Sequence, residues 1–423
     1  MRLILKLFSP VLVITTLFQV FLISHGFPAP KPHIDVPLRP VNILLPGLLG
    51  FGENVGVNRA VPYFGALTGL DFGEELEKRG FETYQADIGP ISSEWDRACE
   101  LYAQLTGTRV DYGAAHSEKY GHERYGRTYE KPLFEGWGDT RPVNLIGHSF
   151  GANAARMFAL LCGQGAAAER ESTPAAELSP LFAGGMIARV HSVTAFAGPH
   201  NGTTAAGCVS DEHEGEPYLW YARLMNYMGS NRVVNGVYDL QLDHFGMSTH
   251  PGGWSQWPNW ATARSFLNSL DHAFYGCSLD GAAALNRIDK IHPSVYYFSY
   301  SGVISQPYED RQLPRPREYA DPVLFWWSFQ IGRGTGWIAS PGPEWLVNDG
   351  LVPLPSALYP QGQPHRDFIP GVTKVEPGVW NLMPTVDNAD HAYWCGGDFL
   401  RHDPDEVFGI YLELMERLES TYD

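Results

Sequence analysis

The sequence GHSFG at positions 147–151 constrains the chain more than any other feature, because it joins an apolar run to a helical segment. The run VNLI at 143–146 precedes it, and an alanine-rich stretch at 152–162 follows it. A serine hydroxyl is a useful nucleophile only when it is held out of the fold beside a base. A sharp strand-to-helix turn does this, and its crowding demands glycines two positions before and after the serine. We therefore predict that Ser149 is a nucleophile.

Apolar runs and helical segments alternate along the rest of the chain. Strands are predicted at 41–45, 81–86, 191–196 and 295–300, and helices at 72–79 and 405–418. This alternation predicts a mostly parallel sheet with helices on both faces. The expected fold class is α/β, of the α/β-hydrolase type, with residues 27–423 as a single domain.

Two stretches lack this alternation, and we interpret both as insertions over the carboxyl edge of the sheet. The first, 91–137, is polar and contains glycine and histidine; the second, 202–268, is long and irregular. Within the second, Trp220 and Met225 belong to an apolar cluster at 218–228. That cluster fits either a lid over the site or an ordinary buried helix.

A strand-to-helix turn that carries a nucleophile in this way is called a nucleophile elbow. In this fold the elbow is followed along the chain by an acid and then by a histidine. His391 lies in a loop before the last helix, where the base belongs, and Asp349 lies at a turn between apolar residues able to bury it. A buried carboxylate would orient the imidazole and stabilise its charged form. The other late histidines are His365 and His402, and Asp387 and Asp390 are competing acids.

An oxyanion site needs two backbone N–H groups aimed at the developing charge. One is expected from Phe150, immediately after the nucleophile. The other is expected from the glycine-rich loop at 46–52, which follows the first strand, and Leu48 is the predicted donor.

The N-terminus has the residue pattern of a targeting signal, so we do not expect it to form part of the fold. Arg2 and Lys6 precede an apolar run at 7–23, and small residues follow, so we predict a signal peptide at 1–26 and secretion. An uncleaved membrane anchor is the alternative. The net charge of −17 argues against nucleic acid as a partner. The five cysteines permit disulfides, but their pairing cannot be read from the sequence.

Long matches outside these residues carry a family resemblance. They include GPISSEWDRACE at 89–100, DYGAAH at 111–116 and PHNGTT at 199–204. With them, the chain resembles the thermoalkalophilic bacillary and staphylococcal lipases, a family of secreted triacylglycerol lipases.

This resemblance implies a structural zinc site built from two aspartates and two histidines. The matching positions are Asp96, His116, His122 and Asp271. Two imidazoles and two carboxylates form a closed tetrahedral zinc shell without cysteine. The family's calcium site uses a glutamate two residues after the catalytic histidine. Tyr393 stands there, so calcium is doubtful despite Asp398 and Asp403 nearby.

The expected function is hydrolysis of long-chain acylglycerol esters through an acyl-enzyme on Ser149. The expected partners are an ester substrate at an interface and, transiently, a lipid surface; the sequence does not define the oligomeric state. A carboxylesterase or phospholipase of the same fold is the first alternative, and a non-catalytic binding protein is the second. The presence of Ser149, Asp349 and His391 together argues against the second.

Overall fold

A computed structural model of the chain describes residues 39–53, 61–65, 69–208, 238–247, 260–315, 321–334, 340–397 and 404–422. The predicted signal segment 1–26 and most of the insertion 202–268, including Trp220 and Met225, lie outside these residues, as do Asp398 and Asp403. Among the helices of these ranges, none has the length and apolarity that a membrane span requires.

Seven strands form one sheet, in the order β11-β12-β7-β6-β5-β1-β2, and every neighbouring pair is parallel. The strands are β1 (Val41–Leu45), β2 (Thr83–Gln85), β5 (Val143–His148), β6 (Val190–Phe196), β7 (Tyr296–Tyr300), β11 (His365–Asp367) and β12 (Trp380–Leu382). The predicted parallel sheet is confirmed. Of the predicted strands, 81–86 is shorter in the structure, and 143–146 continues to the residue before Ser149.

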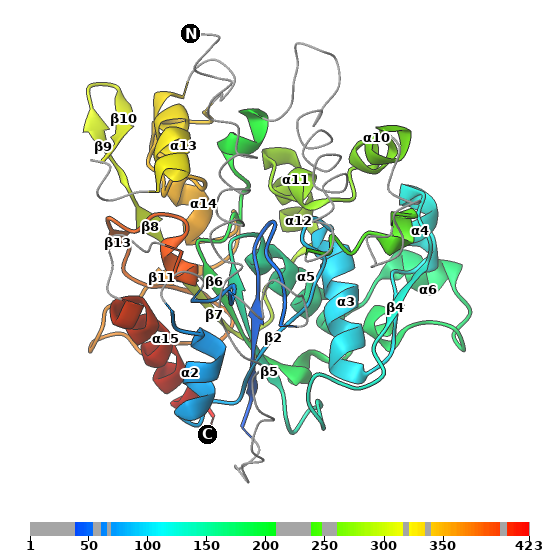
Figure 1. Cartoon of the computed structure of the whole chain (residues 1–423). Helices are drawn as coiled ribbons and strands as arrows, with labels where there is room; N and C mark the ends of the chain where they lie inside the picture. The colour runs from blue at the N-terminus through cyan, green and yellow to red at the C-terminus, as the bar shows by residue number, and fades with distance from the viewer. Residues whose placement is uncertain are drawn as a thin grey trace.

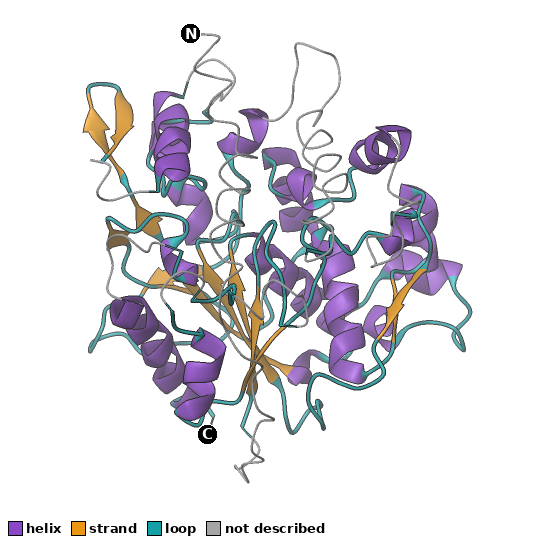
Figure 2. Ribbon diagram, in the orientation of Figure 1, coloured by secondary structure: helices purple, strands orange, loops and turns teal. Residues whose placement is uncertain are grey.

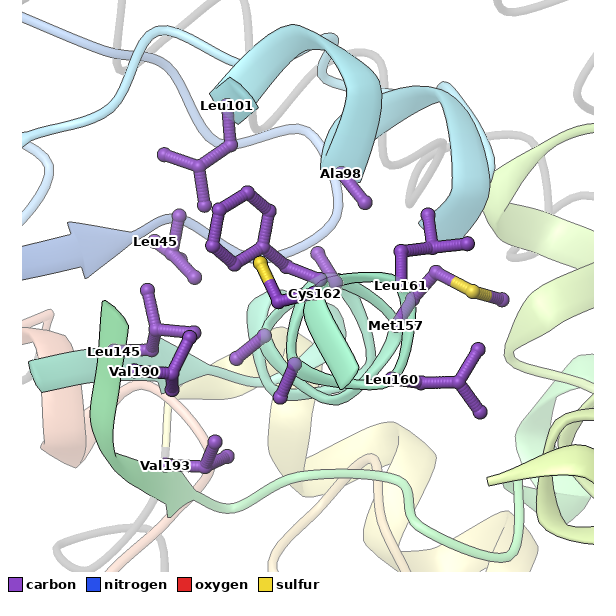
Figure 3. Close-up of a cluster of buried hydrophobic side chains, with 14 of the residues drawn as sticks. Leu45, Ala98, Leu101, Leu145, Met157, Leu160, Leu161, Cys162, Val190 and Val193 are labelled. Atoms are coloured by element: carbon purple, nitrogen blue, oxygen red, sulfur yellow. The ribbon is translucent and has the colours of Figure 1, made fainter. Parts of the chain in front are cut away.

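Helices cover both faces of this sheet (Figure 1), because successive side chains of a buried parallel strand point to opposite faces. α2 (Phe72–Lys78) and α15 (Pro404–Glu419) lie on one face, where they pack against Leu44. α3 (Glu94–Thr106) and α5 (Phe150–Gln164) lie on the other, where they pack against Leu45. Figure 3 shows side chains from α3 and the strands gathered around α5.

The helix α3 lies within the segment 91–137, which the sequence analysis interprets as an insertion, and it packs into the core of the sheet. Ala98 and Leu101 lie in the same core cluster as the apolar residues of β1 and β5. The helix also buries four polar residues: Asp96, Arg97, Glu100 and Gln104. Because these interrupt its apolar stripe, the sequence pattern does not predict the helix. The bounds 91–137 of a metal-bearing insertion stay a prediction.

The remaining elements surround the sheet and leave its carboxyl edge to loops and short helices (Figure 2). The helices are α4 (Ala114–Tyr120), α6 (Ala167–Ser172), α7 (Pro180–Ala183), α10 (Trp260–Ser269), α11 (Ala273–Gly276), α12 (Leu279–Ile288), α13 (Pro322–Arg333) and α14 (Leu354–Leu358), and the minor strand pairs are β3–β4 (Arg109–Asp111 with Tyr125–Thr128), β8–β13 (Gly302–Val303 with Val386–Asp387) and β9–β10 (Ser305–Tyr308 with Arg311–Pro314). Four of the cysteines, Cys99, Cys162, Cys277 and Cys395, are buried free thiols.

Candidate active site and metal centre

Ser149 lies between the end of β5 and the start of α5, in a backbone conformation that only a forced turn imposes. Its φ is 53° and its ψ is −128°. A non-glycine residue held there costs roughly 1–3 kcal/mol, a strain that persists only where the surrounding structure imposes it. The turn therefore presents the serine side chain at the carboxyl edge of the sheet, as the GHSFG sequence predicts.

The two glycines of the motif are needed because backbone surrounds them. A Cβ on Gly147 would lie 2.4 Å from the amide nitrogen of Ala152, and a Cβ on Gly151 would lie 2.2 Å from the carbonyl oxygen of Leu45. No side chain fits at these distances. The crowding that the sequence predicts is thus present on both sides of Ser149.

Ser149, His391 and Asp349 form one continuous chain of hydrogen bonds. The Nε2 of His391 lies 2.8 Å from the Oγ of Ser149, and its Nδ1 lies 2.8 Å from the Oδ2 of Asp349. The other oxygen of Asp349 accepts the N–H groups of Leu351 and Val352, at 2.9 and 2.7 Å. The carboxylate is fully buried. This is the geometry in which a histidine can take a proton from a serine.

The competing acids have other partners. Asp390 is buried, but its carboxylate accepts the N–H groups of Ala392, Tyr393 and Asp321. Asp387 is exposed and pairs with Arg315. Of the three carboxylates, Asp349 is the one that contacts the imidazole. His365, a competing base, is exposed and stacks on Tyr359 instead.

The glycine-rich loop approaches the nucleophile closely. A Cβ on Gly47 would lie only 2.8 Å from the Cβ of Ser149. Leu48 packs against Phe150, and within the described residues its N–H has no hydrogen-bond acceptor. The N–H of Phe150 belongs to the first residue of α5, where no carbonyl of the helix can accept it. Both predicted donors therefore lie beside Ser149.

Asp96, His116, His122 and Asp271 meet in one cluster that could hold a metal ion. One ligand atom from each lies within 4.8 Å of all the others. The residues come from α3, α4, the turn after α4 and the segment before α11. A β-bridge between Ser92 and His272 joins the first and last of these segments. The four residues whose family positions imply a zinc site are thus close together in space.

The donor set fits a divalent cation. The Nε2 of His116 lies 3.0 Å from the Oδ2 of Asp271, and the Nε2 of His122 lies 3.2 Å from that same oxygen. The Nδ1–H of His122 donates to its neighbour's carbonyl at 2.9 Å, which leaves Nε2 as a ligand atom. Burial disfavours a charged His116, but the two carboxylates outweigh this and raise its pKa to about 9. The cluster therefore attracts positive charge.

Tyr393 occupies the position two residues after His391, and the doubt about calcium stays a prediction. Its side chain is buried and its hydroxyl donates to Glu406 at 3.3 Å, so it offers no carboxylate beside His391. Asp398 and Asp403 lie outside the described residues.

Comparison with known proteins shows the family of the chain. The family model described as lipase-like, C-terminal domain, matches residues 39–421. The chain belongs to this family. Lipase 2 of Staphylococcus aureus is 35% identical over 378 residues, which cover 86% of this chain and 52% of that protein. Lipase 1 of S. aureus strain MRSA252 is 31% identical over 359 residues, which cover 84% of this chain and 50% of that protein. The chain spans about half the length of these relatives.

Solved structures of lipases share the fold over almost the whole chain. The Staphylococcus hyicus lipase has a TM-score of 0.79 and 28% identity, and the match covers 93% of this chain and all of that one. Lipase 1 from Pelosinus fermentans has a TM-score of 0.70 and 31% identity, with coverage of 90% and 99%. The predicted resemblance to staphylococcal lipases and the α/β-hydrolase type of fold are confirmed.

Two further histidines of this lipase-like domain lie beside the metal cluster and the candidate active site, and the sequence analysis does not predict a role for either of them. His244 places its Nε2 3.0 Å from the Oδ2 of Asp96 and stacks on Tyr112, so it fixes the carboxylate from outside the metal cluster. His148 contacts Tyr63 and the main chain of His391. The position of His148 inside GHSFG is a usable signal, whereas an isolated histidine in the segment 202–268 gives none.

Proposed function

We propose that the protein is a secreted lipase that hydrolyses acylglycerol esters through an acyl-enzyme on Ser149. The observation that carries the proposal is the chain of 2.8 Å hydrogen bonds from Ser149 through His391 to Asp349, at a strained elbow. The staphylococcal relatives named lipases support the choice of substrate. The apolar run at 7–23 supports secretion.

Each step uses a group in the described site. The Nε2 of His391 takes the proton of Ser149 as Oγ attacks the ester carbonyl, and Asp349 stabilises the resulting imidazolium. The N–H groups of Leu48 and Phe150 donate to the oxyanion. The imidazolium then protonates the leaving alkoxide, and His391 activates the water that releases the fatty acid.

Substrate preference tests the proposal against its nearest alternative. The purified protein should hydrolyse emulsified long-chain triacylglycerol at least as fast as a soluble short-chain ester, because a lipase acts on substrate at an interface. Fatty-acid release by titration measures both rates, and the Ser149→Ala variant sets the background. Activity confined to soluble esters would favour a carboxylesterase, and release from phosphatidylcholine alone a phospholipase.

We also propose that the cluster of Asp96, His116, His122 and Asp271 binds zinc in a structural role. Four protein ligands complete a tetrahedral shell, so no position is open for a catalytic water. When bound, zinc would supply cross-linking between α3, α4 and the segment before α11, rather than chemistry at Ser149.

Removing this metal should lower thermal stability. Metal analysis of protein purified without chelator should find about one equivalent of zinc, and chelation should lower the Tm on the order of 5 °C, since binding energy is folding energy here. His122→Ala should show the lower Tm already and respond no further to chelator. His365→Ala removes an exposed histidine elsewhere and should behave as the wild type. Protein that carries no metal and ignores chelator would contradict the assignment.

A further inference from the structure

Arg97 is a fully buried cation whose hydrogen-bond partners are backbone carbonyls. From α3, its Nη1 donates to the carbonyl of Pro46 at 3.0 Å, and its Nη2 donates to those of Gly47 and Pro90 at 3.1 and 2.7 Å. None of the ion pairs in the described part of the chain involves it. Its guanidinium also lies 5.0 Å from the ring centroid of Phe150. A buried charge that donates to three backbone carbonyls of two loops needs an explanation.

The bond to Gly47 controls the direction of the Leu48 N–H. The carbonyl of Gly47 and the N–H of Leu48 belong to one planar, trans peptide unit, so they point in opposite directions. When Arg97 holds the oxygen on its own side, the N–H must face away from α3. A donor on the carbonyl side also polarises the peptide, which strengthens the N–H as a donor.

The other amides of the loop already have acceptors. The N–H of Gly47 donates to the Oη of Tyr63 at 3.0 Å, that of Leu49 to Pro90 at 2.8 Å, and that of Gly50 to Gly47 at 3.1 Å. Leu49 closes this turn with a φ of 60°, which is strained for a leucine. Of the amides from 47 to 50, that of Leu48 is the one with no acceptor among the described residues, so its N–H is available to a ligand.

Tyr63 connects this loop to the main chain of the base. Its oxygen accepts the Gly47 N–H, so its own proton goes to the Nδ1 of His148, 2.7 Å away. The Nε2–H of His148 then donates to the carbonyl of His391 at 2.9 Å. Burial and the nearby His391 lower the pKa of His148 to about 3, so this neutral form persists at neutral pH.

We propose that Arg97 and Tyr63 are positioning residues that preset the oxyanion site: Arg97 fixes the Gly47–Leu48 peptide, and Tyr63 holds the same loop in register with His391 through His148. The proposal rests on the proposed ester hydrolysis. It identifies the Leu48 N–H as a donor prepared before substrate binds, which is where such donors act most strongly.

The test compares two variants with matched controls. Arg97→Lys keeps the charge but cannot reach three carbonyls, and Tyr63→Phe removes only the hydroxyl. Arg156→Lys is the control for the first, because Arg156 is also buried and hydrogen-bonded, on α5. Tyr297→Phe is the control for the second, because the Oη of Tyr297 also accepts a backbone N–H at 3.0 Å, that of His292.

The readout is kcat and KM for p-nitrophenyl butyrate, per active site titrated with a phosphonate ester. We expect kcat to fall roughly 30- to 100-fold in Arg97→Lys and Tyr63→Phe, with KM within about two-fold, because misplaced donors affect the transition state. Affinity for a trifluoromethyl ketone should fall in parallel with kcat/KM. Both controls should keep kcat within about three-fold of the wild type, whatever their Tm.

The outcomes separate this proposal from the proposed function. A wild-type protein that hydrolyses no ester overturns the proposed function itself. An active wild type with Tyr63→Phe at full kcat, or with controls as impaired as the test variants, overturns the positioning roles alone. If Arg97→Lys does not fold, Tyr63→Phe with the ketone series still decides, since that substitution removes a single oxygen.

Discussion

Replacing Ser149 with alanine should lower kcat for ester hydrolysis by about 10⁶-fold, the loss expected when one member of a triad is removed. His391→Ala should cost about as much, because Oγ without its base is an ordinary hydroxyl. The double variant should lose little more, since the two residues act as a unit through the 2.8 Å bond between them. Initial rates on a soluble ester and on an emulsion measure all three.

The control for Ser149→Ala is Ser328→Ala. Ser328 is fully buried, whereas Ser149 is half-buried, and the Oγ of Ser328 has no hydrogen-bond partner in the described part of the chain. That variant should keep wild-type turnover. The Tm of Ser149→Ala should stay near that of the wild type, because alanine meets the same strained backbone. More than about one percent residual turnover in pure Ser149→Ala would remove the nucleophile assignment.

The sequence predicted those elements whose conformation depends on residues that are close together in the chain. The run VNLI and the alanines after GHSFG predict β5 and α5, and steric crowding at Gly147 and Gly151 explains the motif itself. The strand β1 is equally plain, since all five of its residues are buried. These features depend on neighbours in the chain, so the sequence displays them directly.

Hydrophobic periodicity does not predict α3, because this helix buries polar residues. Arg97 has the character of a surface residue in the sequence, but it is buried because it donates to three carbonyls, two of which belong to the distant loop after β1. Asp96 is buried because two histidines from other segments of the chain, His116 and His244, face its two carboxylate oxygens. Such partners become visible only when the fold brings the segments together, so periodicity predicts neither the helix nor the contacts.

The fold separates Asp349 from the two acids that compete with it in the sequence. Asp349, Asp387 and Asp390 all precede His391 in an order that the elbow allows, and Asp390 is equally buried. What separates them is the direction of each carboxylate: Asp349 faces the Nδ1 of His391, and Asp390 faces backbone N–H groups. The sequence predicted Asp349 from its apolar surroundings, and the role of this residue stays a prediction that substitution can test.

Asp349→Asn should lower kcat by about 10⁴-fold while leaving the fold intact. The N–H groups of Leu351 and Val352 require an acceptor at Oδ1, so the amide oxygen of asparagine stays there and its NH₂ faces His391. An NH₂ donor forces the imidazole proton onto Nε2, which then cannot accept the proton of Ser149. Asp390→Asn places the same change one residue from the base and should alter stability but not the proton on His391. The variants are compared by kcat per titrated active site and by the downfield NMR proton of the His391–Asp349 bond. A kcat for Asp349→Asn within about ten-fold of the wild type, or an equal loss in Asp390→Asn, would assign the orienting carboxylate elsewhere.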